Sequence, residues 1–237
     1  MGLLELDRVS RHYSGGSRVA LDEVSLVLEA GEMVSVWGER RSGRSTLMRV
    51  AAGIEQPDTG RVLLAGRELH TLGDALGSGV GYCRKRFRAT ARESVLDHLL
   101  AAQYARRVHA STALTRAWKA LRRVDAEAFS ALHPSELDAG EIVRVAVARA
   151  LTAEPSVLVI DEPTLGIDPD ERDVILRLLR SIADEGIAVL TCTSEGTGLL
   201  GADRVLSLSK GRLRGELSPE LAPVTDLSRH RHTSGQL

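Results

Sequence analysis

The sequence predicts an α/β protein built around a parallel sheet. Short apolar strands alternate with helical segments through most of the chain, as they do when helices connect parallel strands. A glycine-containing loop at 38–46 lies between an expected strand and an expected helix, where phosphate-binding loops occur. A helical stretch from about residue 84 to residue 140 contains no strand-like run. We therefore expect a parallel core with an inserted helical part.

The first half of the chain is rich in alternating apolar and polar residues, which favours strands. The expected strands are 3–9, 19–28, 33–37, 61–69 and 79–83, with turns at 14–17 and 57–60 and a helix at about 44–52.

In the second half, helical periodicity is followed by short apolar runs. The expected helices are 93–106, 113–123, 140–153 and 170–184, and the expected strands are 157–160, 187–191 and 205–209, the last of them followed by a turn at 210–211. Pro169 stands near the start of the last helix, where proline is tolerated. After about residue 218 the chain is polar, and we expect a mobile tail.

Composition and net charge exclude some classes of protein. The chain has 237 residues, of which 43% are hydrophobic and 27% are charged, with a formal net charge of −1. These values are typical of a soluble globular protein of one large domain or two small ones. The charge gives no global basic field, so we expect no nucleic-acid partner.

Neither the cysteines nor the chain start indicates a secreted or membrane-spanning protein. Cys83 and Cys192 lie far apart in apolar runs, so we expect free thiols rather than a disulfide or metal site. The first ten residues are acidic and resemble no signal peptide. No stretch approaches the roughly 18 uncharged apolar residues that span a bilayer. Any membrane part must then come from another chain.

The loop at 38–46 follows the pattern G-x-x-x-x-G-K-[ST] at Gly38, Gly43 and Ser45, but Arg44 replaces the lysine. Backbone N–H groups at the helix start offer an anion site, and Ser45 can present its hydroxyl to Mg²⁺. Arg44 keeps the positive charge but replaces a compact ammonium with a planar fork. The candidate phosphate-binding residues are Gly38, Arg40, Arg41, Ser42, Gly43, Arg44, Ser45 and Thr46.

Two carboxylates follow the apolar strand at 157–160. Asp161 is placed to hold Mg²⁺, together with Ser45. Glu162 is placed to polarise an attacking water and is the candidate catalytic residue. With the phosphate loop, these residues predict a nucleotide site.

With these motifs in place, residues 3–216 resemble the ATP-binding subunit of an ABC transporter. The stretch 137–168, LDAGEIVRVAVARALTAEPSVLVIDEPTLGID, is similar to the signature helix, Walker B strand and D-loop of that family. Tyr13 resembles the aromatic residue that stacks on adenine. Residues 31–34 and 53–57 are most similar to the lipoprotein-release and macrolide-export branch.

The resemblance implies a P-loop NTPase fold with ATP and Mg²⁺ as cofactors. It implies a RecA-like parallel core, an antiparallel β subdomain carrying Tyr13 and an inserted α-helical subdomain at about 84–140. The nucleotide-binding domain would span 1–217 and the tail 218–237. It adds Asp138, Gly140, Asp168 and Ser194 to the candidate nucleotide-binding residues.

Several departures from the family pattern converge on the nucleotide. Arg44 replaces the lysine, and Arg41 replaces a glycine at a cost of about 1–2 kcal/mol if the backbone there has positive φ. Lys85 replaces a glutamine near Mg²⁺, and Asp138 replaces a serine that binds the γ-phosphate held by the opposing subunit. Ser194 replaces the switch histidine.

Some departures also have structural explanations. Asp138 and Glu141 form a D-x-x-E pattern ahead of an apolar helix, which is typical of a capping box. Lys85 and its basic neighbours form either a solvated face or a docking patch for a membrane subunit. The resemblance nevertheless implies damage to both surfaces that enclose a nucleotide in a head-to-tail dimer.

We therefore expect an ATP-binding subunit with weak or absent hydrolysis, coupled to a separate transmembrane permease at the cytoplasmic face of the membrane. A second nucleotide-binding subunit with competent ATPase motifs is the expected partner, giving a heterodimer, although a homodimer stays possible. Two alternatives are a fully active ATPase that tolerates Arg44 and a scaffolding subunit that binds no nucleotide.

Overall fold

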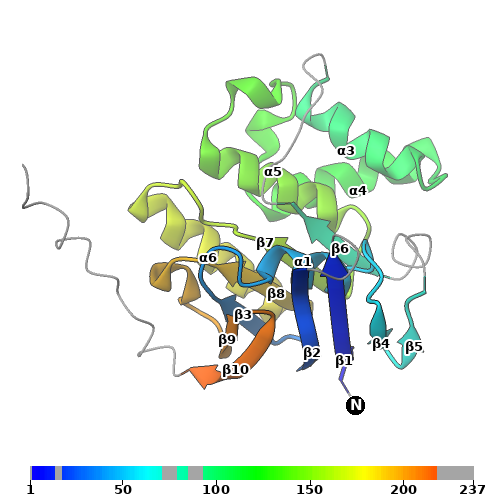
Figure 1. Ribbon diagram of the computed structural model, residues 1–237. Helices are drawn as coiled ribbons and strands as arrows, with labels where there is room; N and C mark the ends of the chain where they lie inside the picture. The colour runs from blue at the N-terminus through cyan, green and yellow to red at the C-terminus, as the bar shows by residue number, and fades with distance from the viewer. Residues whose placement is uncertain (1, 14–17, 71–78, 85–92, 218–237) are drawn as a thin grey trace, which may run out of the picture.

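The computed structural model describes residues 2–13, 18–70, 79–84 and 93–217. Within these ranges the strands form two sheets, and the helices between residues 95 and 151 lie above the larger sheet in the view of Figure 1. The expectations for the turn at 14–17, for Lys85 and for the tail at 218–237 lie outside the described residues. No helix in the described ranges has the length and apolar character needed to cross a membrane.

The larger sheet has six strands in the order β10-β9-β3-β8-β7-β6. Its strands are β3 (Met33–Trp37), β6 (Val80–Cys83), β7 (Val157–Asp161), β8 (Ala188–Thr193), β9 (Arg204–Ser209) and β10 (Arg212–Leu217). All neighbours pair in parallel except β9 and β10. Since β7 and β8 are buried along their whole length, the predicted parallel core is confirmed.

The smaller sheet has four strands in the order β2-β1-β4-β5, and all its neighbours pair antiparallel. Its strands are β1 (Leu4–Tyr13), β2 (Arg18–Leu28), β4 (Thr59–Leu64) and β5 (Arg67–Glu68). This sheet is the predicted antiparallel layer, and it carries Tyr13 as expected. The strand β1 is longer than the expected 3–9, because it continues to Tyr13.

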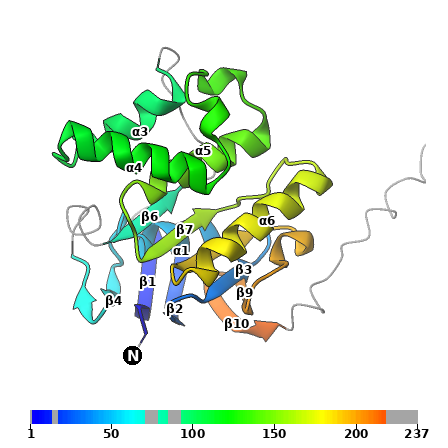
Figure 2. The same cartoon turned by 180° about the vertical axis from the view of Figure 1, so that it is seen from behind.

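The helices cover both faces of the parallel sheet (Figures 1 and 2). They are α1 (Arg44–Ala51), α3 (Val95–Tyr104), α4 (Ala110–Arg123), α5 (Ala139–Leu151) and α6 (Pro169–Asp184), with 3₁₀ turns at Glu127–Phe129, Pro134–Glu136 and Gly196–Leu199. Alternate residues of β7 face opposite ways, as strand geometry requires. Val157 and Val159 join the core shared with α1 and the smaller sheet. Leu158 and Ile160 join the core shared with α3 to α6.

Two hairpins of the structure were not predicted as hairpins. The single strand expected at 61–69 is divided into β4 and β5, because Ala65 and Gly66 have φ values of 48° and 77°. The unpredicted strand β10 follows Lys210 and Gly211, with φ values of 49° and 80°. Two successive positive φ values favour a two-residue hairpin turn. The strands β4 and β5 therefore form one hairpin, and β9 and β10 form another.

The buried middle of β8 gives a test of the core. Leu190 is fully buried, so Leu190→Ala leaves a cavity and should lower the free energy of unfolding by about 2–5 kcal/mol. Leu200→Ala is the control, because Leu200 is 57% exposed and its truncation should change stability by less than about 0.5 kcal/mol. Urea unfolding measures both. Equal effects of the two variants would contradict the assigned core.

Candidate functional site

The loop at 38–46 joins β3 to α1, and two of its glycines are needed where backbones approach closely. A Cβ on Gly38 would lie 2.4 Å from the carbonyl oxygen of Leu208. Gly43 has a φ of 111°, and a Cβ there would lie 2.2 Å from the carbonyl oxygen of Ala20. These contacts hold the loop against β9 and β2, at the edge of the parallel sheet where ligands of α/β proteins bind.

The arginines of this loop lie in different surroundings. Arg40 and Arg41 are exposed. Arg41 has a φ of 68°, a left-handed conformation that costs a side-chain-bearing residue about 1–2 kcal/mol. The expectation of backbone strain at this position is thus confirmed. Arg44, the first residue of α1, is instead only 7% exposed.

Two buried donors in the loop lack hydrogen-bond partners within the described part of the chain. They are the Ser42 hydroxyl and Nη1 of Arg44. An unsatisfied buried polar group typically costs about 1–3 kcal/mol, so each such group calls for an explanation. An oxyanion held by the loop would satisfy both donors. The residues present therefore fit the phosphate groups of a nucleotide.

Ser45 and Asp161 come together as the sequence predicted. The Ser45 hydroxyl donates to Oδ1 of Asp161 at 3.2 Å. The parallel register of β7 and β8 sets Asp161 beside Cys192, whose Sγ donates to the same oxygen at 3.1 Å. A carboxylate and a hydroxyl are suitable ligands for Mg²⁺, which binds through one or two protein carboxylates and the phosphates of its substrate.

No described group of three or more His, Cys, Asp and Glu side chains is arranged to hold a metal by itself. The negative charge of Asp161 nevertheless acts on its neighbours. Burial, and then Asp161, raises the pKa of Cys192 well above its usual value. The same two causes raise the pKa of Tyr82 to about 12. Both side chains therefore stay neutral near pH 7, and a cation beside Asp161 is favoured electrostatically.

The candidate base Glu162 makes two side-chain contacts with other predicted site residues. Nη2 of Arg44 lies 2.9 Å from its Oε1, and the two side chains are 7% and 4% exposed. The Ser194 hydroxyl donates to its Oε2 at 3.1 Å. The backbone of Glu162 is left-handed, with a φ of 57°. The cation expected to bind phosphate is thus paired with the carboxylate expected to activate water.

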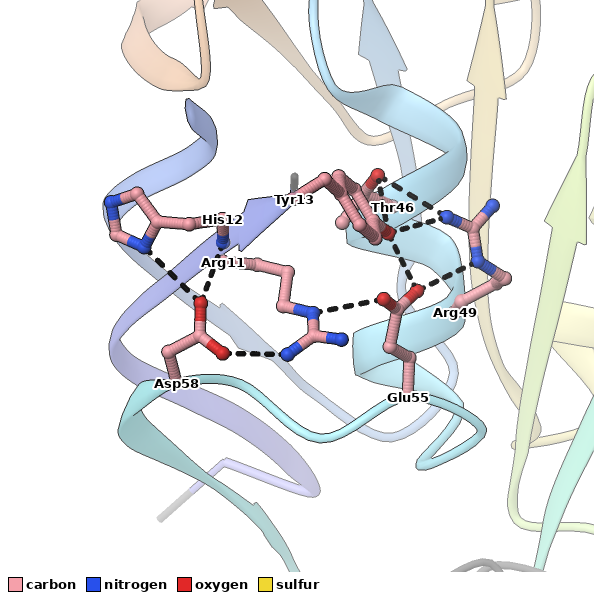
Figure 3. A network of polar contacts seen from close by, with 7 residues as sticks. All are labelled: Arg11, His12, Tyr13, Thr46, Arg49, Glu55 and Asp58. Carbon is pink, nitrogen blue, oxygen red and sulfur yellow. Dashed lines mark hydrogen bonds and ion pairs between the residues drawn. The ribbon is translucent and has the colours of Figure 1, made fainter. Parts of the chain in front are cut away.

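Tyr13 lies in a network of polar contacts between β1, α1 and the loop that follows α1 (Figure 3). Its hydroxyl donates to Oε2 of Glu55 at 2.8 Å and accepts from Nη2 of Arg49 at 2.8 Å. It also lies 3.3 Å from Oγ1 of Thr46. The guanidinium carbon of Arg11 is 5.3 Å from the centre of the ring. Tyr13 is therefore close to the phosphate loop, with Arg11 over one face of its ring.

The carboxylates of this network are held in their charged form. The backbone N–H of His12 and the guanidinium of Arg11 lower the pKa of Asp58. Burial acts to raise the pKa of Glu55, but hydrogen bonds from Tyr13, Arg49 and Arg11 outweigh it and the pKa is lowered.

Asp138, Gly140 and Asp168 make local contacts near the starts of two helices, α5 and α6. The exposed Asp138 caps α5: its Oδ1 accepts from the Glu141 N–H at 2.8 Å, and Glu141 accepts from the Asp138 N–H at 2.9 Å. The predicted capping box is confirmed. A Cβ on Gly140 would displace the Glu171 side chain of α6. Asp168 is exposed ahead of α6. In the described chain no hydrogen bond or ion pair joins Asp138 or Asp168 to the loop.

Four side chains of the site were not predicted from the sequence: Arg11, Arg49, Glu55 and Cys192. Arg49 follows Thr46 by three residues on α1, a spacing that places both on one helix face. Cys192 lies beside Asp161 because β7 and β8 pair in parallel. The sequence pattern does not indicate which residues of two strands are paired. For Arg11 and Glu55, which are 44 residues apart, we find no such signal.

The cap of α5 gives one test. Asp138→Ala removes the acceptor for the Glu141 N–H and should cost about 1 kcal/mol of unfolding free energy. Asp138→Ser keeps a capping oxygen and should cost less than about 0.5 kcal/mol. Urea unfolding of the full chain compares the two variants, and equal losses would contradict the capping role.

The lowered pKa of Asp58 gives a pH test. A carboxyl group whose pKa is lower in the folded state stabilises the fold above its unfolded pKa. It loses that contribution as the pH falls through the folded pKa. Asp58→Asn should therefore destabilise the chain at pH 7, and the difference from wild type should shrink between about pH 5 and pH 2. Unfolding curves at several pH values measure it. A pH-independent difference would contradict the interpretation.

Comparisons with known proteins agree with this geometry. A family model described as ABC transporter matches residues 21–165. The lipoprotein-releasing system ATP-binding protein LolD of Chromohalobacter salexigens is 33% identical over 219 residues, covering 89% of this chain and 92% of the relative. The methionine import ATP-binding protein MetN of Caulobacter vibrioides is 33% identical over 241 residues, covering 96% and 71%.

Solved structures show the same fold. A dimeric bacterial ABC transporter cassette, MJ0796, matches with a TM-score of 0.81 at 24% identity, over 91% of this chain and 98% of that one. CbiO1 of Clostridium perfringens, part of an ABC transporter complex, matches with a TM-score of 0.79 at 26% identity, over 92% and 89%. The chain has a P-loop NTPase fold and belongs to the ABC transporter family of ATP-binding proteins, with relatives that include the LolD branch.

Proposed function

We propose that this chain is an ATP-binding subunit of an ABC transporter that binds ATP with Mg²⁺ and hydrolyses it weakly or not at all. The unpartnered donors of Ser42 and Arg44 support a phosphate site, and Ser45 with Asp161 supports the metal position. When bound, ATP supplies the phosphoanhydride bond whose cleavage would drive transport.

The main support for the proposal of weak hydrolysis is the buried ion pair between Arg44 and Glu162, whose atoms lie 2.9 Å apart. A general base must come within hydrogen-bond reach of the water that it activates. One oxygen of Glu162 faces Arg44 and the other accepts from Ser194. Each contact occupies one acceptor position of the carboxylate, so fewer positions remain from which water can reach Glu162. Arg44 must also leave Glu162 before its whole guanidinium can turn to phosphate.

A second subunit completes the site in this proposal. Asp138 and Asp168 are exposed, and in this proposal they face the nucleotide of a head-to-tail partner. Asp138 would bring a negative charge towards that partner's phosphate, which is unfavourable. We therefore propose a heterodimer with a competent ATPase chain rather than a homodimer.

The membrane partner follows from the relatives. They are named as ATP-binding proteins of lipoprotein-release, methionine-import and sulfate-import systems. We propose that this chain likewise acts on a separate permease from the cytoplasmic face of the membrane. The branch resemblance favours export.

The test is ATP turnover by the purified chain at saturating Mg-ATP, with Glu162→Gln as the control for contaminating ATPase. We expect wild type and control to be alike, while Arg44→Lys raises turnover by about tenfold or more, because a shorter ammonium frees Glu162. Arg122→Lys is the control for an arginine-to-lysine change outside the site, since the Arg122 side chain on α4 is 75% exposed, and it should leave turnover unchanged.

Two outcomes would overturn this function. Wild-type turnover near one per second, abolished by Glu162→Gln, would instead establish an active ATPase that tolerates Arg44. Calorimetry that detects no ATP binding to wild type or to Arg44→Lys would establish a scaffolding subunit without nucleotide.

A further inference from the structure

The carboxylate of Glu55, in the loop after α1, accepts hydrogen bonds from three side chains. Its Oε2 accepts from the Tyr13 hydroxyl at 2.8 Å and from Nε of Arg49 at 2.9 Å. Its Oε1 accepts from Nε of Arg11 at 2.9 Å. The side chain is 16% exposed, so these contacts are largely shielded from water. One carboxylate therefore connects β1, α1 and the loop after α1 (Figure 3).

Arg11 is fixed as firmly as Tyr13. Glu55 holds its Nε, and Oδ1 of Asp58 lies 2.6 Å from its Nη1. Between these carboxylates the guanidinium sits over the Tyr13 ring, 5.3 Å from the centroid, within the range of a cation–π contact. The ring is thus restrained at its hydroxyl and has a guanidinium against one face.

We propose that Glu55 is a positioning residue for the nucleobase: by holding Tyr13 and Arg11 together it pre-forms the aromatic surface on which the base stacks. This inference rests on the proposed function, because it requires a nucleotide in the phosphate loop. A base gains most from stacking on a ring that is already fixed, since ordering a free side chain opposes binding. Glu55 itself does not touch the base.

The charge balance explains why a carboxylate is needed there. Two arginines, Arg11 and Arg49, meet two carboxylates, Glu55 and Asp58. A glutamine at position 55 would turn its –NH₂ group towards at least one of the three donors, because an amide has a single acceptor oxygen. Glu55→Gln thus keeps the side chain's shape and breaks the arrangement that fixes Tyr13.

The experiment compares two ligands of the full chain by calorimetry: ATP, and inorganic tripolyphosphate, which carries the phosphates without the base. We expect Glu55→Gln to weaken ATP binding roughly three- to tenfold and to leave tripolyphosphate binding unchanged. Tyr13→Phe, which keeps the ring but removes the hydroxyl, should weaken ATP binding similarly. The double variant should lose no more than the larger single loss, because Glu55 acts through that hydroxyl.

The matched control is Asp7→Asn, which removes the carboxylate of an exposed ion pair with Arg61 on the same sheet and should change neither affinity. Equal losses for ATP and tripolyphosphate in Glu55→Gln, or no loss for ATP, would overturn the inference while leaving the proposed function intact. Additive losses in the double variant would also overturn it. A wild-type chain that binds neither ligand would overturn the proposed function itself.

Discussion

The parallel pairing of β3, β8 and β7 brings the carboxyl ends of three strands to one edge of the sheet, and the whole candidate site depends on it. The phosphate loop leaves β3, Asp161 ends β7, and Cys192 and Ser194 lie at and beyond the end of β8. Because neighbouring parallel strands end at the same level, these residues meet although they are far apart in the sequence. Burial of β7 and β8 on both faces makes this register costly to change.

Three buried or half-buried arginines of the site form ion pairs with carboxylates. Arg44 meets Glu162 at the phosphate end, and Arg11 and Arg49 meet Glu55 at the Tyr13 end. Each pair restrains a residue that a nucleotide would need. The consequences that we propose differ between the two ends: the pair at Glu162 would limit the access of water to a base, whereas the contacts at Glu55 would hold an aromatic ring in place. In this proposal, the same kind of ion pair opposes catalysis at one end of the site and favours nucleotide binding at the other.

Most helices and strands could be predicted, because the spacing of apolar residues within each one indicates its type without knowledge of distant residues. The strand at 157–160 and the helix at 170–184 differ from β7 and α6 by a single residue at one end. The hairpin β4–β5 was missed because its turn uses Ala65 at positive φ, a residue that does not signal such a turn. At the hairpin β9–β10 the turn at 210–211 was predicted, but the strand that follows it was not. The capping box at Asp138 was predictable, since both partners lie within one helical turn.

The sequence by itself determined the α/β class, the phosphate loop, the strand-end carboxylates and the departures at Arg41, Arg44 and Asp138, because each is a matter of residue type and short spacing. Only the tertiary structure decided which side chains those residues meet. That Arg44 pairs with Glu162, that Cys192 donates to Asp161, and that Glu55 holds Tyr13 with Arg11 depend on strand register and on the close approach of distant segments. Long-range proximity of this kind leaves no local pattern in the chain.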